Sequence, residues 1–382
     1  MKYYMKKFLF VSVVLVILTS LITGCGQQAS NTAVEMSQTE MDQLLSTAQI
    51  QLEEGKLDEA LVTYEKAIEG DPSSAKANFG AGLLGALALI KDNNTRAIFS
   101  KAGITLPVNL NQLLTVSSSQ AVTTHFSNLP SFNRAYGTFT ITVPEIQTYI
   151  KDTLIPAIDK ALARLDKVEQ DSSFNFMVTK KMSGGDENVE IDLGEIYALD
   201  SYLSFMKAIF QELISYDWNC SYVGTVNPFE DPNYPNFGKL KSDGQQNMGK
   251  ARDAYARMFT KLIAGIEYIA AETDDQSDDG VPKFSKAEEK TDVLKYLNFF
   301  KASFENGPTI FNFGSGSTTV NFKGYYSSPV QDWHKFYIKP ANPNSPISAS
   351  DFGPNYDFTL NGLLPDLNSF SKWSDFSKNF VI

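Results

Sequence analysis

The chain's best-spaced set of potential cation ligands lies in the acidic stretch 272–286, ETDDQSDDGVPKFSK. Asp275, Ser277 and Asp279 place oxygen atoms at alternate positions, and Gly280 follows where a sharp turn is needed. Oxygen ligands at this spacing wrap one hard cation, as in the first half of a calcium loop. One hypothesis is therefore a calcium site on these three residues. The alternative is an acidic, solvated loop between two helices.

The second half of this stretch departs from the EF-hand pattern that the first half resembles. Lys286 stands at the twelfth position, where an EF-hand has a bidentate glutamate, and Pro282 stands at the usually aliphatic eighth. Glu288 comes two residues later and fits a capping box with Ser285. A calcium site here would therefore be degenerate.

A second group of acids follows a period-two pattern. Val189 to Leu193 alternates apolar and acidic residues, which predicts a short strand with Glu190 and Asp192 on one face. With Glu195, these carboxylates could serve a hydrolase or hold a cation. A solvated edge strand explains them equally well. We therefore rank a carboxylate-based hydrolase as the weakest functional hypothesis.

Composition excludes several classes of protein. The chain has 382 residues, a net charge of −11 and only two cysteines and two histidines, so a Cys/His zinc site and a disulfide scaffold are not expected. His125 and His334 have no evident Ser or Cys partner, and the motifs GxSxG and HExxH are absent. Acidity argues against nucleic-acid binding. We expect a globular protein of two or three domains that is not an enzyme.

The N-terminus has the organisation of a secretory signal. Lys2, Lys6 and Lys7 precede the apolar stretch 8–22, which is short for a membrane span. The sequence Leu-Ile-Thr-Gly-Cys at 21–25 resembles a bacterial lipobox. The resemblance implies cleavage after residue 24, lipid (palmitate) on Cys25, and anchoring in the cell envelope, more at the outer membrane or cell surface than at the inner membrane. The alternatives are an ordinary secretory peptide or an uncleaved anchor.

Cleavage would change the chain that has to fold. Removing 24 of 382 residues leaves 358, and losing three lysines changes the net charge from −11 to −14. Cys220 would remain as a lone cysteine, which predicts a small buried apolar side chain. Residues 25–40 then form a polar tether.

Residues 41–74 predict two amphipathic helices separated by Gly55. This segment resembles the tetratricopeptide (TPR) pattern at Ala48, Gly55, Ala60, Tyr64, Ala67 and Pro72. The resemblance implies a protein-binding repeat, with Leu44, Ala48, Tyr64 and Asn78 as the candidate binding residues. One and a half repeats cannot bury a continuous core, so the repeat must dock on the rest of the chain. The alternative is a plain helical hairpin without a ligand.

The segment 75–90 predicts the first helix of a second repeat, and its partner would have to lie near 95–101, where the pattern fits poorly. The literal GxGxxG at 80–85 falls inside this helix. No helix N-terminus therefore faces a phosphate, and we interpret the glycines as sites of close helix contact.

Long amphipathic helices dominate the region that follows. Apolar residues at helical spacing predict helices from Thr142 to Leu165, kinked at Pro156, from Ile196 to Ile214, from Met248 to Ile269, and from Ser285 to Phe304. After residue 307 the composition predicts a β-hairpin and a Pro-rich aromatic arm, which packs back on the helices or contacts a partner.

The resulting prediction is a mainly α protein, with TPR-like helical hairpins docked on an α-helical bundle, a small β-hairpin and an extended C-terminal arm. We predict a signal peptide (1–24), a tether (25–40), a TPR-like region (41–100), a helical core (101–306) and the hairpin with its arm (307–382). The leading functional hypothesis is a lipid-anchored envelope protein that binds or scaffolds another protein. The alternative is an envelope lipoprotein that binds calcium or a glycan.

Overall fold

The computed structural model describes residues 36–101, 106, 141–183, 187–220, 227–273, 287–313, 316–338, 348–352 and 356–373. These residues form eleven α-helices and two small antiparallel two-stranded sheets, which confirms the mainly α prediction. Two compact units are distinguished, and each is described by itself. Unit 1 comprises Met1–Ile141, Thr148–Met206 and Lys261–Lys290, and unit 2 comprises Thr142–Gln147, Lys207–Thr260 and Thr291–Ile382.

This division differs from the predicted domains because several helices contribute residues to both units. The helices shared in this way are α8 (Val143–Tyr149), α11 (Leu193–Ser215), α12 (Gly244–Ala271) and α13 (Ala287–Glu305). A composition change along the chain, such as the one after residue 307, therefore does not mark a unit boundary.

Unit 1 begins with helices joined by short turns: α2 (Gln38–Glu53), α3 (Leu57–Gly70), α4 (Ala75–Leu87), a 3₁₀ turn (Ala88–Lys91) and α5 (Asn93–Lys101). Ser37 and Glu40 form a capping box, in which the Glu40 N–H donates to the Ser37 Oγ at 3.3 Å. Gly55 adopts a φ of +70° between α2 and α3, a conformation that favours glycine. Helix α5 covers the segment 95–101, where the sequence fitted the second helix of a further repeat poorly.

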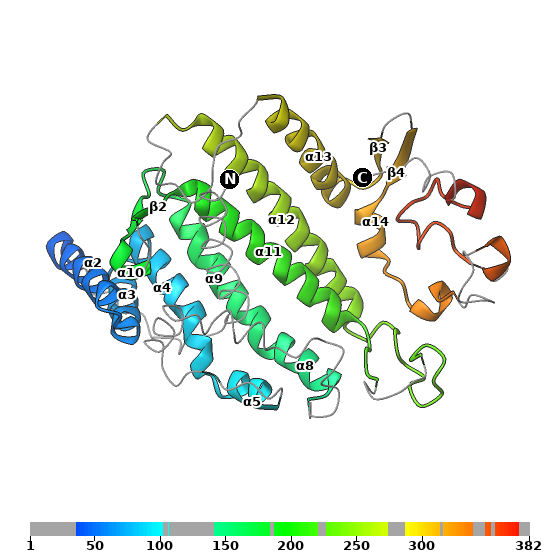
Figure 1. Ribbon diagram of the computed structural model, residues 1–382, viewed down its shortest axis with the longest axis horizontal. Coiled ribbons are helices and arrows are strands. Elements are labelled where there is room, and N and C mark those ends of the chain that lie inside the picture. The colour runs from blue at the N-terminus through cyan, green and yellow to red at the C-terminus, as the bar shows by residue number, and fades with distance from the viewer. Residues whose placement is uncertain are drawn as a thin grey trace. The chain divides into compact units, whose positions relative to one another are not determined.

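Small residues let these helices pack closely. Ala48, Ala60 and Ala67 are fully buried, and Tyr64 is 1% exposed. A Cβ atom at Gly80 of α4 would lie 2.4 Å from the Tyr64 ring, so only glycine allows this approach. Helix α4 then packs on α9 (Ile155–Val168), as Figure 1 shows, which agrees with the predicted docking of the repeat.

Pro156 explains a local change of helix type. Residues Ile150–Leu154 form a π-helical turn, and Pro156 follows in the first turn of α9. Proline has no N–H, and its ring clashes with the carbonyl four residues earlier, at Asp152. A wider turn before the proline removes this clash. The predicted interruption at Pro156 is thus a π turn.

A small sheet leads into α11. Strands β1 (Phe176–Val178) and β2 (Val189–Ile191) are antiparallel, with Met177 opposite Glu190, and α10 (Lys180–Ser183) lies between them in sequence. Phe79 of α4 lies 4.9 Å from Phe176, centroid to centroid. The predicted strand is therefore present but ends at Ile191.

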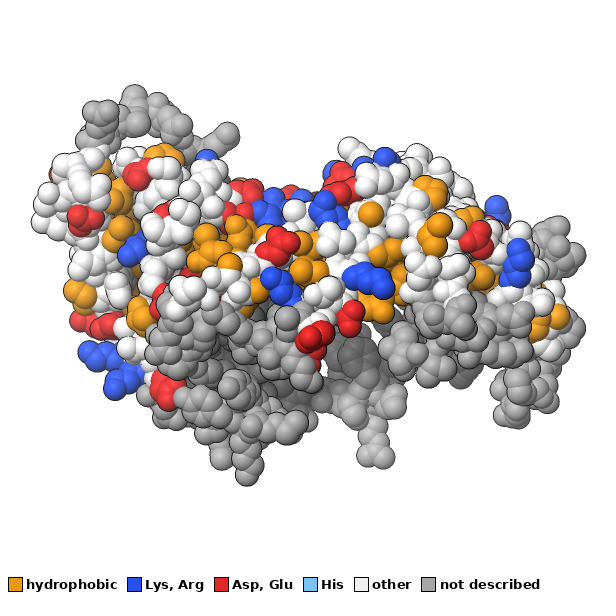
Figure 2. Space-filling model, turned by 90° about the horizontal axis from the view of Figure 1, so that it is seen from above, with side chains coloured by type: hydrophobic (Ala, Val, Ile, Leu, Met, Phe, Trp, Pro, Cys, Tyr) orange, Lys and Arg blue, Asp and Glu red, His pale blue; other side chains and the backbone are white. Residues whose placement is uncertain are grey.

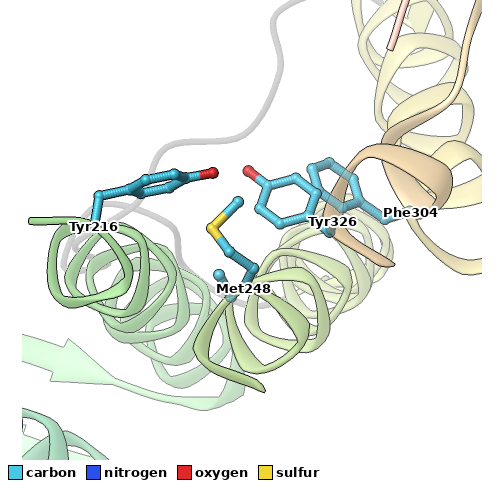
Figure 3. Close-up of a cluster of buried hydrophobic side chains, with 5 residues drawn as sticks. Tyr216, Met248, Phe304 and Tyr326 are labelled. Carbon is cyan, nitrogen blue, oxygen red and sulfur yellow. The ribbon is translucent and has the colours of Figure 1, made fainter. Parts of the chain in front are cut away.

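In unit 2, aromatic side chains form the core. Met248 and Ala251 of α12 pack with Tyr216, Phe304 and Tyr326 (Figure 3). The hairpin of β3 (Thr309–Phe313) and β4 (Gly316–Val320) is confirmed, and α14 (Phe322–Ser327) follows it.

The described part of the C-terminal arm packs back on unit 2. The N–H of Asn321 donates to the Leu363 carbonyl at 2.8 Å, and the N–H of Thr319 donates to Asp366 at 2.7 Å. Leu367 is 6% exposed. Two 3₁₀ turns, Trp333–Phe336 and Ala349–Asp351, complete the unit. For the residues described, these contacts agree with the first of the two alternatives, in which the arm packs back on the protein.

Candidate functional sites

The candidate binding residues of the TPR-like region lie mostly inside unit 1. Ala48 is fully buried, Tyr64 is 1% exposed and Asn78 is 4% exposed. The Asn78 amide donates to the carbonyls of Pro72 at 3.0 Å and Ser74 at 2.9 Å, and so fixes the turn between α3 and α4. Leu44 is partly exposed. Ala48, Tyr64 and Asn78 therefore hold the helices together, and any partner would contact other side chains.

The outer face of α2 is one accessible surface of this region. Thr39, Asp42, Gln43, Ser46 and Thr47 lie together on this open face of α2. Ile50 follows Gln43 and Ser46 at helical spacing and is 54% exposed. The face thus combines hydrogen-bonding side chains with one accessible apolar side chain.

The acids predicted on the short strand cap a helix. The Asp192 Oδ1 accepts from the Gly194 N–H at 2.6 Å, and the Glu195 Oε2 accepts from the Asp192 N–H at 3.0 Å. Glu190 accepts a hydrogen bond from Asn175. Because Asp192 and Glu195 satisfy backbone N–H groups at the start of α11, their positions have a structural explanation without catalysis.

A different set of acids converges in unit 1. Asp166 and Glu169 at the end of α9 and Asp200 of α11 each bring a carboxylate oxygen within 4.8 Å of the others. Lys261 of α12 forms an ion pair with Glu169, and its Nζ lies 3.9 Å from the Asp200 Oδ2. The side chains of Lys261, Glu169 and Asp200 are 17%, 11% and 0% exposed. Three carboxylates at this spacing could ligate a cation, and here the lysine ammonium supplies the positive charge.

The surroundings of Glu169 in this cluster shift the pKa of its carboxyl group. Burial raises the pKa of Glu169, and the Asp200 charge raises it further, although Lys261 opposes both. The Glu169 Oε1 is buried without a hydrogen-bond partner. The cluster thus joins α9, α11 and α12 through Lys261, and burial is the main reason that the pKa of Glu169 is raised.

Two features of the sequence point to this cluster. Glu169 is the C-cap residue of α9, where a negative charge opposes the helix dipole. Asp200 and Ser204 fall on the buried stripe of α11 with Ile196. An acid at a helix C-terminus and an acid on an apolar stripe both need a cation, but the identity of Lys261 as that cation depends on tertiary packing.

We predict that Glu169 makes unit 1 more stable in mild acid. A folded-state pKa above 4.5 means that the folded chain holds more protons than the unfolded chain between 4.5 and the raised value. Stability from this group is therefore lost as the pH rises through that window. Relative to Glu169→Gln, the wild-type free energy of unfolding should rise as the pH falls from neutral toward 4.5, measured by urea unfolding at several pH values.

Glu65 provides a control of opposite sign. Burial alone would raise its pKa, but Arg164, 2.6 Å away, and Lys160 hold it below its usual value. Relative to Glu65→Gln, the wild type should lose stability as the pH falls through the lowered folded-state pKa. If both groups changed the free energy of unfolding in the same direction as the pH falls, the raised pKa assigned to Glu169 would be wrong.

Other predicted site residues lie outside the described residues. These are Cys25 and the calcium candidates Asp275, Ser277 and Asp279. Cys220 is described as a free, half-buried cysteine whose thiol pKa is raised by burial. Both the lipidation site and the calcium site therefore stay predictions.

No protein-family model, no curated protein and no solved structure matches this chain. The likeness to tetratricopeptide repeats and to bacterial lipoproteins thus depends on the residues quoted above. None of the helices in the described part combines the length and apolar character needed to cross a membrane. On the face seen in Figure 2, acidic and basic side chains of the described residues are interspersed, so that face carries no extended field of one sign.

Proposed function

We propose that this chain is a lipid-anchored protein of the bacterial cell envelope that binds another protein through its TPR-like helices. The lipobox-like sequence ending at Cys25 supports the anchor. The observation that carries the binding role is the outer face of α2, where polar side chains and the exposed Ile50 lie on a scaffold fixed by buried small residues. A rigid scaffold lowers the entropy lost on binding.

Exposed positions on α2 and α3 allow a matched test. Ile50 is 54% exposed on α2, and Val62 is 68% exposed on α3. We predict that Ile50→Glu lowers recovery of the crosslinked partner from intact envelopes by about tenfold, because a charge at a central contact costs on the order of 1–2 kcal/mol of binding. Val62→Glu should leave recovery unchanged. Quantitative mass spectrometry after pull-down measures both.

Both substitutions place the same charge at an exposed helical position, so each should change the free energy of unfolding by less than about 0.5 kcal/mol. Equal recovery with the two variants and the wild type would overturn the assignment of the α2 face. Equal loss with both variants would show that the repeat is disturbed as a whole and would also count against this face.

A further inference from the structure

The two edges of the β3–β4 hairpin in unit 2 (Figure 1) differ in what covers them. On β4, the Thr319 N–H donates to the Asp366 carboxylate at 2.7 Å. Just after the strand, the Asn321 N–H donates to the Leu363 carbonyl at 2.8 Å. The C-terminal arm therefore occupies the outer edge of β4.

The same contacts fix which backbone groups of β3 point outward. Ile310 lies opposite Thr319 in the antiparallel register. Because the Thr319 N–H points away from β3, this pair exchanges no backbone hydrogen bonds, and such pairs alternate with bonded ones. The N–H and C=O groups of Ile310, and of Asn312 two positions later, therefore point away from β4. Within the described part of the chain, no hydrogen bond reaches these groups.

The open edge of β3 lacks the features that usually keep strand edges apart. Natural edge strands carry charges, a proline or a bulge. Neither TIFNF of β3 nor GSTTV of β4 contains a charged residue or a proline, and their register runs without a bulge. Ile310 is 64% exposed, and Asn312 is also exposed. The edge is therefore accessible and free of charge.

The outward groups of β3 match those of a second copy of the same strand. If two β3 strands pair antiparallel about Phe311, Ile310 of each copy lies opposite Asn312 of the other. Each such pair can then exchange both of its backbone hydrogen bonds. A register in which Ile310 faces its own copy would instead place Pro308, which has no N–H, opposite Asn312. The register centred on Phe311 thus uses both outward donors of β3.

Charge and apolar surface also favour a second copy as the occupant. The chain carries a net charge of −11, so two copies meet with least repulsion at a surface without charge. The Phe311 ring packs on α13, with its centroid 4.7 Å from that of Phe299 and 6.1 Å from that of Tyr296. Tyr296 is 46% exposed. Pairing about Phe311 makes the two Phe311 rings cross-strand neighbours and brings the apolar surface of both copies together.

We propose that two copies of this chain associate by antiparallel pairing of their β3 edges, which forms one four-stranded sheet across a two-fold axis. The interface is isologous, because the same residues of both copies contribute to it. Its backbone hydrogen bonds are those of β-strand addition to an open sheet edge. The inference is independent of the partner-binding face on α2.

Paired cysteines test both the contact and its register. In the purified full-length Cys220→Ser protein, we predict that Ile310→Cys combined with Asn312→Cys gives a disulfide-linked dimer on oxidation with copper phenanthroline. Opposite residues of a bonded antiparallel pair have Cα atoms about 5.5 Å apart, which a disulfide spans. Either substitution alone leaves the two cysteines about 8 Å apart, beyond that reach, so each single variant should stay monomeric.

The matched control is Ser317→Cys combined with Thr319→Cys, which puts the same spacing on β4, whose edge the C-terminal arm occupies. It should stay monomeric under the same oxidant. Electrophoresis without reducing agent separates dimer from monomer, and thermal midpoints verify folding of every variant. Absence of a dimer in the variant with cysteines at both Ile310 and Asn312 would overturn the proposal. An equal yield of dimer in the β4 control or in either single variant would overturn it too.

Discussion

Replacing Cys25 with serine is expected to move the protein from the membrane fraction to the soluble fraction. In the proposed anchor the Cys25 sulfur carries lipid, and stable attachment of a protein without a spanning helix needs more than one acyl chain. Serine has no thiol to modify, so incorporation of labelled palmitate should be lost completely. Metabolic labelling followed by fractionation of the envelope measures both effects.

Cys220 is the matched control, since it is the chain's only other cysteine. Cys220→Ser should retain the label and the membrane fraction, because the structure places this residue as a free, half-buried thiol within the folded chain. If Cys25→Ser kept its palmitate, or if Cys220→Ser lost it, the lipobox interpretation would be wrong. Retention of an unlabelled Cys25→Ser protein in the membrane would instead indicate an uncleaved anchor.

Lys261→Met is expected to lower the free energy of unfolding by about 3–5 kcal/mol, the usual cost of removing one partner from a buried ion pair. Methionine keeps the length and apolar stem of lysine but removes the ammonium group that lies beside Glu169 and Asp200. The resulting repulsion would act where α9, α11 and α12 of unit 1 meet. Urea unfolding at neutral pH measures the loss.

Two comparisons make this result specific. Lys250→Met changes an exposed lysine of the same helix and should cost less than about 0.5 kcal/mol. The double variant Lys261→Met with Glu169→Gln should recover part of the loss, because it removes one of the uncompensated charges. Similar effects at Lys261 and Lys250 would show that the carboxylates do not depend on Lys261.

Local sequence patterns predicted the helices well. Ser37 and Glu40 start α2 with the capping box that their three-residue spacing indicates, and Thr142 and Glu145 form another before α8. Each cap joins residues three apart, so the necessary information is contiguous in sequence. The β-hairpin that begins at Thr309 also joins residues close in sequence. Its second strand ends at Val320, where Asn321 caps α14.

Side-chain roles were harder to predict. The repeat pattern made Tyr64 a candidate contact for a partner, but burial makes it a packing residue between helices. Glu190, Asp192 and Glu195 were grouped because they are close in sequence, yet two of them cap α11. Exposure and hydrogen-bond partners depend on neighbouring elements, and periodicity does not identify those elements.

The sequence by itself determined the helical character of this protein, its turn and cap positions and its acidity, because each depends on composition or on residues a few positions apart. Only the tertiary structure decided which distant residues meet. It brought Lys261 to Glu169 and Asp200, and Trp333 to Tyr216. The free energy of a buried charged or polar group depends on the residues that surround it. These contacts could therefore be recognised only in the tertiary structure.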